Sequence, residues 1–244
     1  MLALKVRTYE QDHCIVLSFT LLSSSHKGLV VDTRIRFIGE IRDDYEITEF
    51  TEIGQYLYKI ARKDNVTNFL ETGASTGGSG RCIATGLQDT TGKLYTFEAS
   101  KTRYQSLVNN LRGLPVIAYN ELSVLTKGIS SYYQVDSDEF AACNQTFEKL
   151  LQNIKFDACF LDSINLCQSL ELQMVLCVKI RHILMHEPDH KCPGYDSLLL
   201  KNGYQLIKAS RDEINRTEGR IAARHCQPLW VHYKFTGFPF SGCL

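Results

Sequence analysis

The chain has 244 residues, a length that suits one large domain or one domain with a modest extension. Hydrophobic residues make up 44% and charged residues 22%, which provides enough apolar side chains for a packed core. Lys plus Arg and Asp plus Glu balance at 27 each, so no overall basic charge attracts the chain to nucleic acid or to an anionic membrane.

Residues 1–45 are predicted to form a β-rich extension. Two apolar, β-rich runs, 13–22 and 28–41, are separated by the turn signal "SSSHKG", which predicts a β-hairpin. The apolar run 14–22 is too short to cross a bilayer, so no membrane-spanning segment is expected here.

Residues 46–65 are predicted to form a leading helix. The apolar residues of this segment recur at helical spacing, at Ile53, Leu57 and Ile60. Thr51 or Thr48 is the expected N-cap, because a threonine hydroxyl can accept a hydrogen bond from a free N–H group of the first helical turn.

From Val66 onward, strand-like runs alternate with helix-like runs. Strands are predicted at 66–73, 93–100, 115–120, 156–163, 182–188, 204–210 and 229–235, and helices at 78–89, 101–113, 138–154, 169–181 and 195–203. The last two strands have no clear helix between them, which indicates an antiparallel hairpin at one edge. The pattern predicts an α/β fold over residues 66–244, with a doubly wound, Rossmann-like, mostly parallel sheet.

The nine cysteines include no Cys-x-x-Cys pair, which argues against a zinc ribbon or a thioredoxin-like motif. Several lie inside apolar runs. They are interpreted as buried, reduced thiols of a cytoplasmic protein.

A glycine-rich stretch, "FLETGASTGGSGRCIATGL" at residues 69–87, joins the first strand of the sheet to a helix. Its five glycines allow the backbone to turn tightly and to approach a ligand, and helix N–H groups follow directly. Such loops hold nucleotide-like ligands. Two chemistries use them, hydride transfer from a nicotinamide and methyl transfer from S-adenosylmethionine.

The hypothesis of hydride transfer rests on "TGASTGGSGRCIA", which resembles the TGxxxGxG run of short-chain dehydrogenases. However, Ser79 stands where that run needs its last glycine, and Gly80 follows one residue late. Tyr204 and Lys208 have the spacing of the family's catalytic pair, yet their segment is predicted to be a strand rather than a helix. An NAD(P)-dependent oxidoreductase therefore stays an alternative.

The hypothesis of methyl transfer rests on the pattern Glu71-x-Gly73-x-x-x-Gly77-x-Ser79, which resembles motif I of class I S-adenosylmethionine-dependent methyltransferases. The resemblance covers about residues 66–235. It is strongest to the small-molecule O-methyltransferases and the related cephalosporin-hydroxylase-like group, in which a carboxylate after the second strand binds both ribose hydroxyls. The resemblance implies S-adenosylmethionine as cofactor and a cofactor site that consists of Glu71, Gly73, Ala74, Ser75, Gly77, Ser79, Glu98, Ala99, Asn120 and Asp162.

The acceptor side is predicted at the ends of the fourth and fifth strands of this sheet. Some of the resembled O-methyltransferases hold a divalent cation there, which acidifies and orients the acceptor hydroxyl. In this chain the corresponding residues are Asp162, His186 and Glu187. Two hypotheses stay open, a Mg²⁺ site with Asp162 and Glu187 as ligands, and a catalytic pair in which Asp162 acts with His186 as a base.

The sequence therefore predicts methyl transfer to an oxygen of a small molecule. An RNA methyltransferase is a second possibility, for which the basic cluster 216–225 is the main signal. A third is a methyltransferase fold without turnover that serves as an interaction subunit. Residues 1–45 would then be a partner surface, and a homodimer through this extension is a further prediction.

Overall fold

The protein is described by a computed structural model that divides into two compact units, Met1–Asp44 and Tyr45–Leu244. The residues that it describes are 3–11, 14–22, 47–63, 66–124, 141, 143–210 and 229–237. None of the helices in these ranges combines the length and the apolar character that a membrane span requires.

The first unit contains a two-stranded antiparallel sheet of β1 (Ala3–Gln11) and β2 (Cys14–Leu22). The predicted strand 13–22 is confirmed as β2, which pairs with β1; its predicted partner, 28–41, lies outside the described residues. The signal for β1 is the alternation of Leu4 and Val6 with basic residues. In the observed register Leu4 pairs with Leu21 and Val6 pairs with Phe19.

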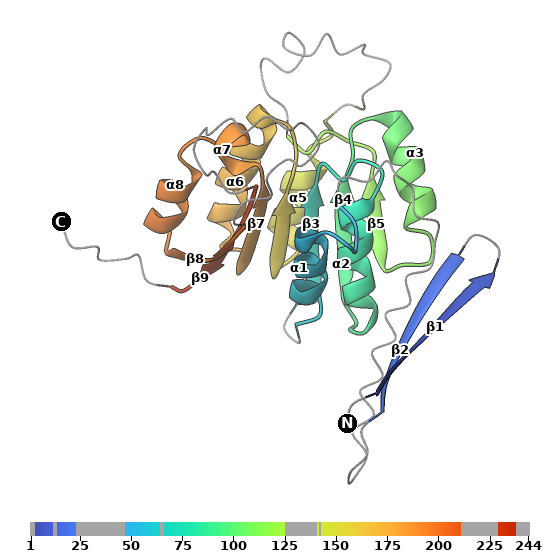
Figure 1. Cartoon of the computed structure of the whole chain (residues 1–244). Helices are drawn as coiled ribbons and strands as arrows, with labels where there is room; N and C mark the ends of the chain where they lie inside the picture. The colour runs from blue at the N-terminus through green and yellow to red at the C-terminus, as the bar shows by residue number, and fades with distance from the viewer. Residues whose placement is uncertain are drawn as a thin grey trace, which may run out of the picture. The chain divides into compact units, whose positions relative to one another are not determined.

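The second unit contains a seven-stranded sheet in the order β5-β4-β3-β6-β7-β9-β8 (Figure 1). The strands are β3 (Asn68–Thr72), β4 (Lys93–Phe97), β5 (Val116–Tyr119), β6 (Ala158–Leu161), β7 (His182–His186), β8 (Tyr204–Ala209) and β9 (Trp230–Phe235). Strands β3 to β7 are parallel, whereas β9 is antiparallel to both of its neighbours. The predicted doubly wound sheet with an antiparallel edge hairpin is confirmed.

Helices cover both faces of this sheet (Figure 1). They are α1 (Glu52–Ala61), α2 (Gly78–Gln88), α3 (Lys101–Asn110), α5 (Thr146–Asn153), α6 (Asn165–Cys177), α7 (Pro188–Lys191) and α8 (Tyr195–Lys201). Helices α1 and α2 pack with one set of strand residues, and α5, α6 and α8 pack with the alternate set. In β3, for example, Phe69 belongs to the first core and Leu70 to the second, and both side chains are fully buried. Burial on both faces explains why these strands read as continuous apolar runs.

Several element boundaries differ from the sequence prediction. Thr51 is the N-cap of α1, where its hydroxyl accepts a hydrogen bond from Gly54 N. The predicted helix 138–154 contains α5 over its second part; in its first part, residues 143–145 are not helical, and 138–140 and 142 lie outside the described residues. Helix α7 was not predicted. It starts at Pro188, a position where the missing N–H of proline has no helical partner to lose.

The order in which the chain adds strands to the sheet changes direction at β3. One half of the parallel sheet runs outward through β4 and β5, and the other runs through β6 and β7. In open α/β sheets, ligands bind at such a switch point, beyond the carboxyl ends of the strands. The residues that follow these strand ends include Gly73, Glu98, Asp162 and Glu187.

A buried chain of polar rings lies elsewhere in this unit, between α1, β7 and β9. Tyr56 Oη is 2.8 Å from His232 Nδ1, and His232 Nε2 is 3.0 Å from His182 Nδ1. These bonds are satisfied with both imidazoles neutral, when Tyr56 donates to His232 and His232 donates to His182. Burial lowers the pKa of His182 to about 4 and that of His232 to about 3, with further lowering from nearby lysines.

We expect this pair to destabilise the fold in acid. Histidines of the unfolded chain take up protons below about pH 6.5, whereas the folded pair resists protonation. Each of the two histidines therefore lowers the free energy of unfolding by about 1.4 kcal/mol per pH unit, until the pH reaches its pKa in the folded state. In urea denaturation, His232→Gln should therefore gain stability relative to the unaltered protein as pH falls from 6.5 to 4.5. Comparing the two proteins at each pH cancels the other titrating groups. A constant difference would contradict the prediction.

Candidate cofactor and acceptor site

The loop after β3 has an unusual backbone. Gly73, Ser75 and Gly77 all have positive φ, at 72°, 50° and 99°. A Cβ atom at Gly73 would lie 2.4 Å from the backbone oxygen of Asp162, so this loop touches the loop after β6. Gly77 is the N-cap of α2 and provides no side-chain hydrogen bond there. The loop thus presents backbone rather than side chains at the start of α2, as a nucleotide-like ligand requires.

Backbone contacts fix this loop against β4. The N–H groups of Gly73 and Ala74 both donate to the carbonyl oxygen of Phe97, each at 3.1 Å. The Ala74 side chain is buried with Leu107 and Leu111, at α3 and its end. Of the predicted cofactor residues, Ala74 can therefore offer a ligand its backbone but not its side chain.

Glu71 lies beneath the loop and is fully buried. Its carboxylate accepts hydrogen bonds from the hydroxyls of Ser79 and Thr96, both at 2.6 Å. Burial raises the pKa of Glu71 to about 7, against the opposing effect of these two bonds. A Cβ atom at Gly80 would lie 2.8 Å from Glu71 Oε2, which explains the glycine at this place. Glu71 and Ser79 thus bind one another beneath the loop, and their contact with a ligand stays a prediction.

Glu98 joins the same loop to the end of β4. Its Oε2 atom accepts a hydrogen bond from Ser75 N at 2.7 Å, and its Oε1 atom accepts one from Ser100 N at 2.8 Å. Burial raises the pKa of Glu98, and these backbone bonds oppose the rise. Each carboxylate oxygen has a second lone pair, which leaves capacity for two ribose hydroxyls. Asn120 Nδ2 donates to the carbonyl oxygens of Glu98 and Ala99 at 2.9 and 3.3 Å, so it braces this segment.

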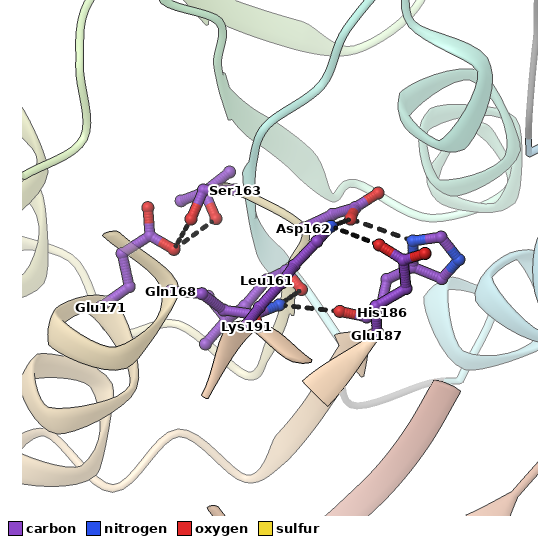
Figure 2. A network of polar contacts seen from close by, with 9 residues as sticks. Leu161, Asp162, Ser163, Gln168, Glu171, His186, Glu187 and Lys191 are labelled. Carbon is purple, nitrogen blue, oxygen red and sulfur yellow. Dashed lines mark hydrogen bonds and ion pairs between the residues drawn. The ribbon is translucent and has the colours of Figure 1, made fainter. Parts of the chain in front are cut away.

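The acceptor-side residues gather in one cluster at the ends of β6 and β7 (Figure 2). Asp162 Oδ1 lies 3.0 Å from His186 Nδ1 and 2.6 Å from Lys191 Nζ. Lys191 Nζ also lies 3.2 Å from Glu187 Oε2. The sequence analysis predicted Asp162, His186 and Glu187 for this side but missed Lys191, which α7 carries into the cluster.

The charges of this cluster act on its two basic groups, His186 and Lys191. Burial alone would lower the pKa of His186, but the hydrogen bond and the charge of Asp162 outweigh it, so the pKa is raised above its ordinary value. Burial alone would also lower the pKa of Lys191, but the charges and hydrogen bonds of Asp162 and Glu187 outweigh it, so this pKa is raised as well. Lys191 is therefore an ammonium at neutral pH. When Asp162 holds Nδ1 of His186, the imidazole directs its other nitrogen, Nε2, away from the carboxylate.

The geometry does not fit the predicted Mg²⁺ site. The proposed ligands Asp162 and Glu187 are joined by the ammonium of Lys191. Moreover, the described part of the chain contains no group of three or more His, Cys, Asp or Glu side chains that could hold a metal ion.

Gln168 of α6 was also missed by the sequence analysis. Its Nε2 atom donates to the carbonyl oxygens of Leu161 at 2.6 Å and His186 at 3.0 Å. It thereby ties together the ends of the two strands that carry Asp162 and His186 (Figure 2).

Glu171, one helical turn after Gln168, holds the other loops of the site. It is fully buried and accepts hydrogen bonds from the hydroxyls of Thr72, Ser163 and Ser123. Burial raises its pKa against the effect of these bonds. The spacing of Gln168 and Glu171, about one turn apart on α6, was the available signal, but the sequence did not reveal their partners.

Comparison with known proteins supports the fold. No protein-family model and no curated protein matches the chain. Among solved structures, a candidate O-methyltransferase from Klebsiella pneumoniae is 15% identical, with a TM-score of 0.51 over 75% of this chain and 79% of that one. The O-methyltransferase TomG from Streptomyces achromogenes, in complex with S-adenosylmethionine, is 15% identical, with a TM-score of 0.51 over 76% and 80% of the two chains.

A candidate rRNA methylase from Clostridium thermocellum is similar to the same degree. It is 11% identical, with a TM-score of 0.51 over 75% of this chain and 96% of that one. The chain therefore has the class I methyltransferase fold. At these identities the likeness does not discriminate a small-molecule acceptor from an RNA.

Proposed function

We propose that the protein is an S-adenosylmethionine-dependent methyltransferase that methylates an oxygen of a small molecule. The observation that carries this proposal is the position of the Asp162–His186 pair. Asp162 follows β6 and His186 is the last residue of β7, and the loop of Gly73 touches the backbone of Asp162. A ligand held by that loop would thus lie beside a base that can accept a proton.

On the cofactor side, the loop residues from Gly73 to Gly77 would bind through their backbone, and Glu98 would accept hydrogen bonds from the ribose hydroxyls. When bound, S-adenosylmethionine supplies a methyl group, whose bond to sulfur breaks as the new carbon–oxygen bond forms, leaving S-adenosylhomocysteine. This assignment is supported by the place of Glu98, whose carboxylate accepts a hydrogen bond from Ser75 N in the loop before α2 and keeps acceptor capacity for a hydroxyl.

On the acceptor side, Asp162 holds His186 through Nδ1, so the neutral ring presents Nε2 as the proton acceptor. His186 would take the proton of the acceptor hydroxyl, and the oxygen would keep the electron pair that forms the bond to the methyl carbon. The resulting imidazolium is stabilised by the carboxylate of Asp162.

The alternatives have less support. Tyr204 and Lys208 lie on β8, where Tyr204 Oη donates to Ile180 O at 2.8 Å and Lys208 pairs with Glu52 at 2.7 Å. This arrangement does not support a dehydrogenase pair. The basic cluster 216–225, which favoured RNA, lies outside the described residues. Dimerisation through residues 1–45 and a cytoplasmic location stay predictions.

Calorimetry with S-adenosylhomocysteine, NAD and NADP tests the cofactor class. We expect saturable binding of S-adenosylhomocysteine and none of the nicotinamides. Binding of a nicotinamide alone would overturn the proposal. If the cofactor binds and transcribed RNA is methylated but hydroxyl compounds are not, the proposed acceptor class is wrong. If the cofactor binds and nothing is methylated, the result favours the hypothesis of an interaction subunit without turnover.

Glu98→Ala is expected to weaken S-adenosylhomocysteine binding by about 1.5–3 kcal/mol, the usual value of a hydrogen bond to a charged group. The variant loses the ribose contacts and also the bond that holds Ser75 N. Calorimetry measures the affinity, and Glu148→Ala, which removes an exposed carboxylate of α5, is the matched control. Equal affinities of Glu98→Ala and the control would remove Glu98 from the site.

A further inference from the structure

Lys191 lies where the sequence predicted a divalent cation, between the strand-end carboxylates Asp162 and Glu187 (Figure 2). We propose that Lys191 is a built-in ammonium that takes the place of a metal ion in the acceptor site, and that these carboxylates bind a divalent cation when the ammonium is removed. The inference rests on the proposed function for its catalytic consequence, whereas its cation-binding part stands on the geometry alone.

The distances support direct replacement. Lys191 Nζ is 2.6 Å from Asp162 Oδ1 and 3.2 Å from Glu187 Oε2, and its side chain is only 15% exposed. Two carboxylates this close to one shared partner repel each other unless a positive charge lies between them. The ammonium supplies that charge with three donors. A metal ion would have to displace it and break both contacts.

The local fold holds Lys191 in this position. Glu187 leaves β7 with a left-handed backbone, φ 48° and ψ 46°, and Pro188 starts the single turn of α7. This turn brings Lys191 back over Glu187 as an i,i+4 pair, with Lys191 N donating to Glu187 O at 3.1 Å. Ser169 of α6 donates to Lys191 O at 3.2 Å. A left-handed glutamate costs about 1 kcal/mol or more, and here it places the lysine.

The substitution has a chemical consequence. Asp162 Oδ1 is shared between Lys191 and His186, so the fixed ammonium is part of the support of the proposed base. Unlike a bound metal ion, a lysine is not removed by a chelator. Methyl transfer at this site should therefore proceed without added metal and in the presence of EDTA.

The test is a titration with Mn²⁺, a cation suited to carboxylate ligands, followed by calorimetry or electron paramagnetic resonance of the full chain. We expect no saturable binding by the unaltered protein. Lys191→Ala should bind Mn²⁺ saturably, at least about tenfold more tightly than the weakest binding that the titration detects. Adding Asp162→Asn to this variant should abolish the gain. Lys208→Ala, which frees the carboxylate of Glu52 on the surface, is the matched control and should gain nothing.

Two results would overturn the inference. One is Mn²⁺ binding by the unaltered protein that Asp162→Asn removes, since the cation site would then coexist with Lys191. The other is Lys191→Ala, or Lys191→Gln if alanine impairs folding, without any gain in Mn²⁺ affinity. Calorimetry with S-adenosylhomocysteine on the same samples separates the two proposals, because failure of cofactor binding would overturn the proposed function and leave the Mn²⁺ result intact.

Discussion

Gly73→Ala is expected to lower the free energy of unfolding by about 2–5 kcal/mol and to weaken S-adenosylhomocysteine binding at least about tenfold. Two costs add in this variant. The backbone of Gly73 has φ +72°, a left-handed conformation that costs an alanine about 1–2 kcal/mol. The new methyl group would also lie 2.4 Å from Asp162 O and 2.8 Å from Ser163 N, an overlap worth roughly another 1–3 kcal/mol.

The second cost links the variant to function. The overlapping atoms are backbone atoms of the loop after β6, so they have no rotamer through which to escape. The Gly73 loop and the Asp162 loop would have to separate, which moves the predicted cofactor contacts away from the predicted base. We therefore expect the loss of affinity to accompany the loss of stability.

Chemical denaturation and calorimetry on the same samples measure the two effects. Gly113→Ala is the matched control, because Gly113 has φ +83° but no atom within 4 Å of the added Cβ. The control should show the conformational cost alone and bind S-adenosylhomocysteine normally. If the two variants lose the same stability and neither loses affinity, the contact between the loops has no role in binding.

The sheet was predictable because its strands carry a local signal. Residues such as Phe69 and Leu70 are buried on opposite faces, so the central strands are apolar runs, and β3, β4, β6 and β7 each have an acid or a glycine after their end. The acids Glu98 and Asp162 could therefore be assigned to strand ends from the sequence. The fold class and the general place of the site follow from such patterns.

The contacts inside the site were not predictable, because they join residues far apart in the chain or depend on one local turn. The motif predicts Glu71 as a ligand contact but does not reveal that its carboxylate accepts a hydrogen bond from Thr96 of the neighbouring strand. Lys191 reads as an ordinary basic residue until the turn at Glu187 and Pro188 brings it beside Asp162. A sequence motif predicts neither the hydrogen-bond partners of a buried side chain nor the direction in which such a turn leads the chain.

His186→Gln is expected to lower kcat for methyl transfer by about 10²–10⁴-fold, the usual contribution of a positioned general base. The affinity for S-adenosylhomocysteine should change much less than kcat, because most of the predicted cofactor contacts, from the Gly73 loop to Glu98, lie on other strands. Single-turnover kinetics with a methylated acceptor as readout measure the loss. His182→Gln is the control, since it removes a buried imidazole from the other end of β7. If both variants keep full kcat, the base lies elsewhere.

The pH profile distinguishes a base from a structural histidine. Only the neutral imidazole accepts a proton, so kcat should rise with pH through the pKa of His186. Burial lowers this pKa, but Asp162 raises it by more, so the rise should lie above the ordinary histidine value of about 6.5. Asp162→Asn removes the charge that raises the pKa and should move the rise to lower pH while reducing kcat. A purely structural His186 would leave the position of the rise unchanged in this variant, because the titrating group would then be another residue.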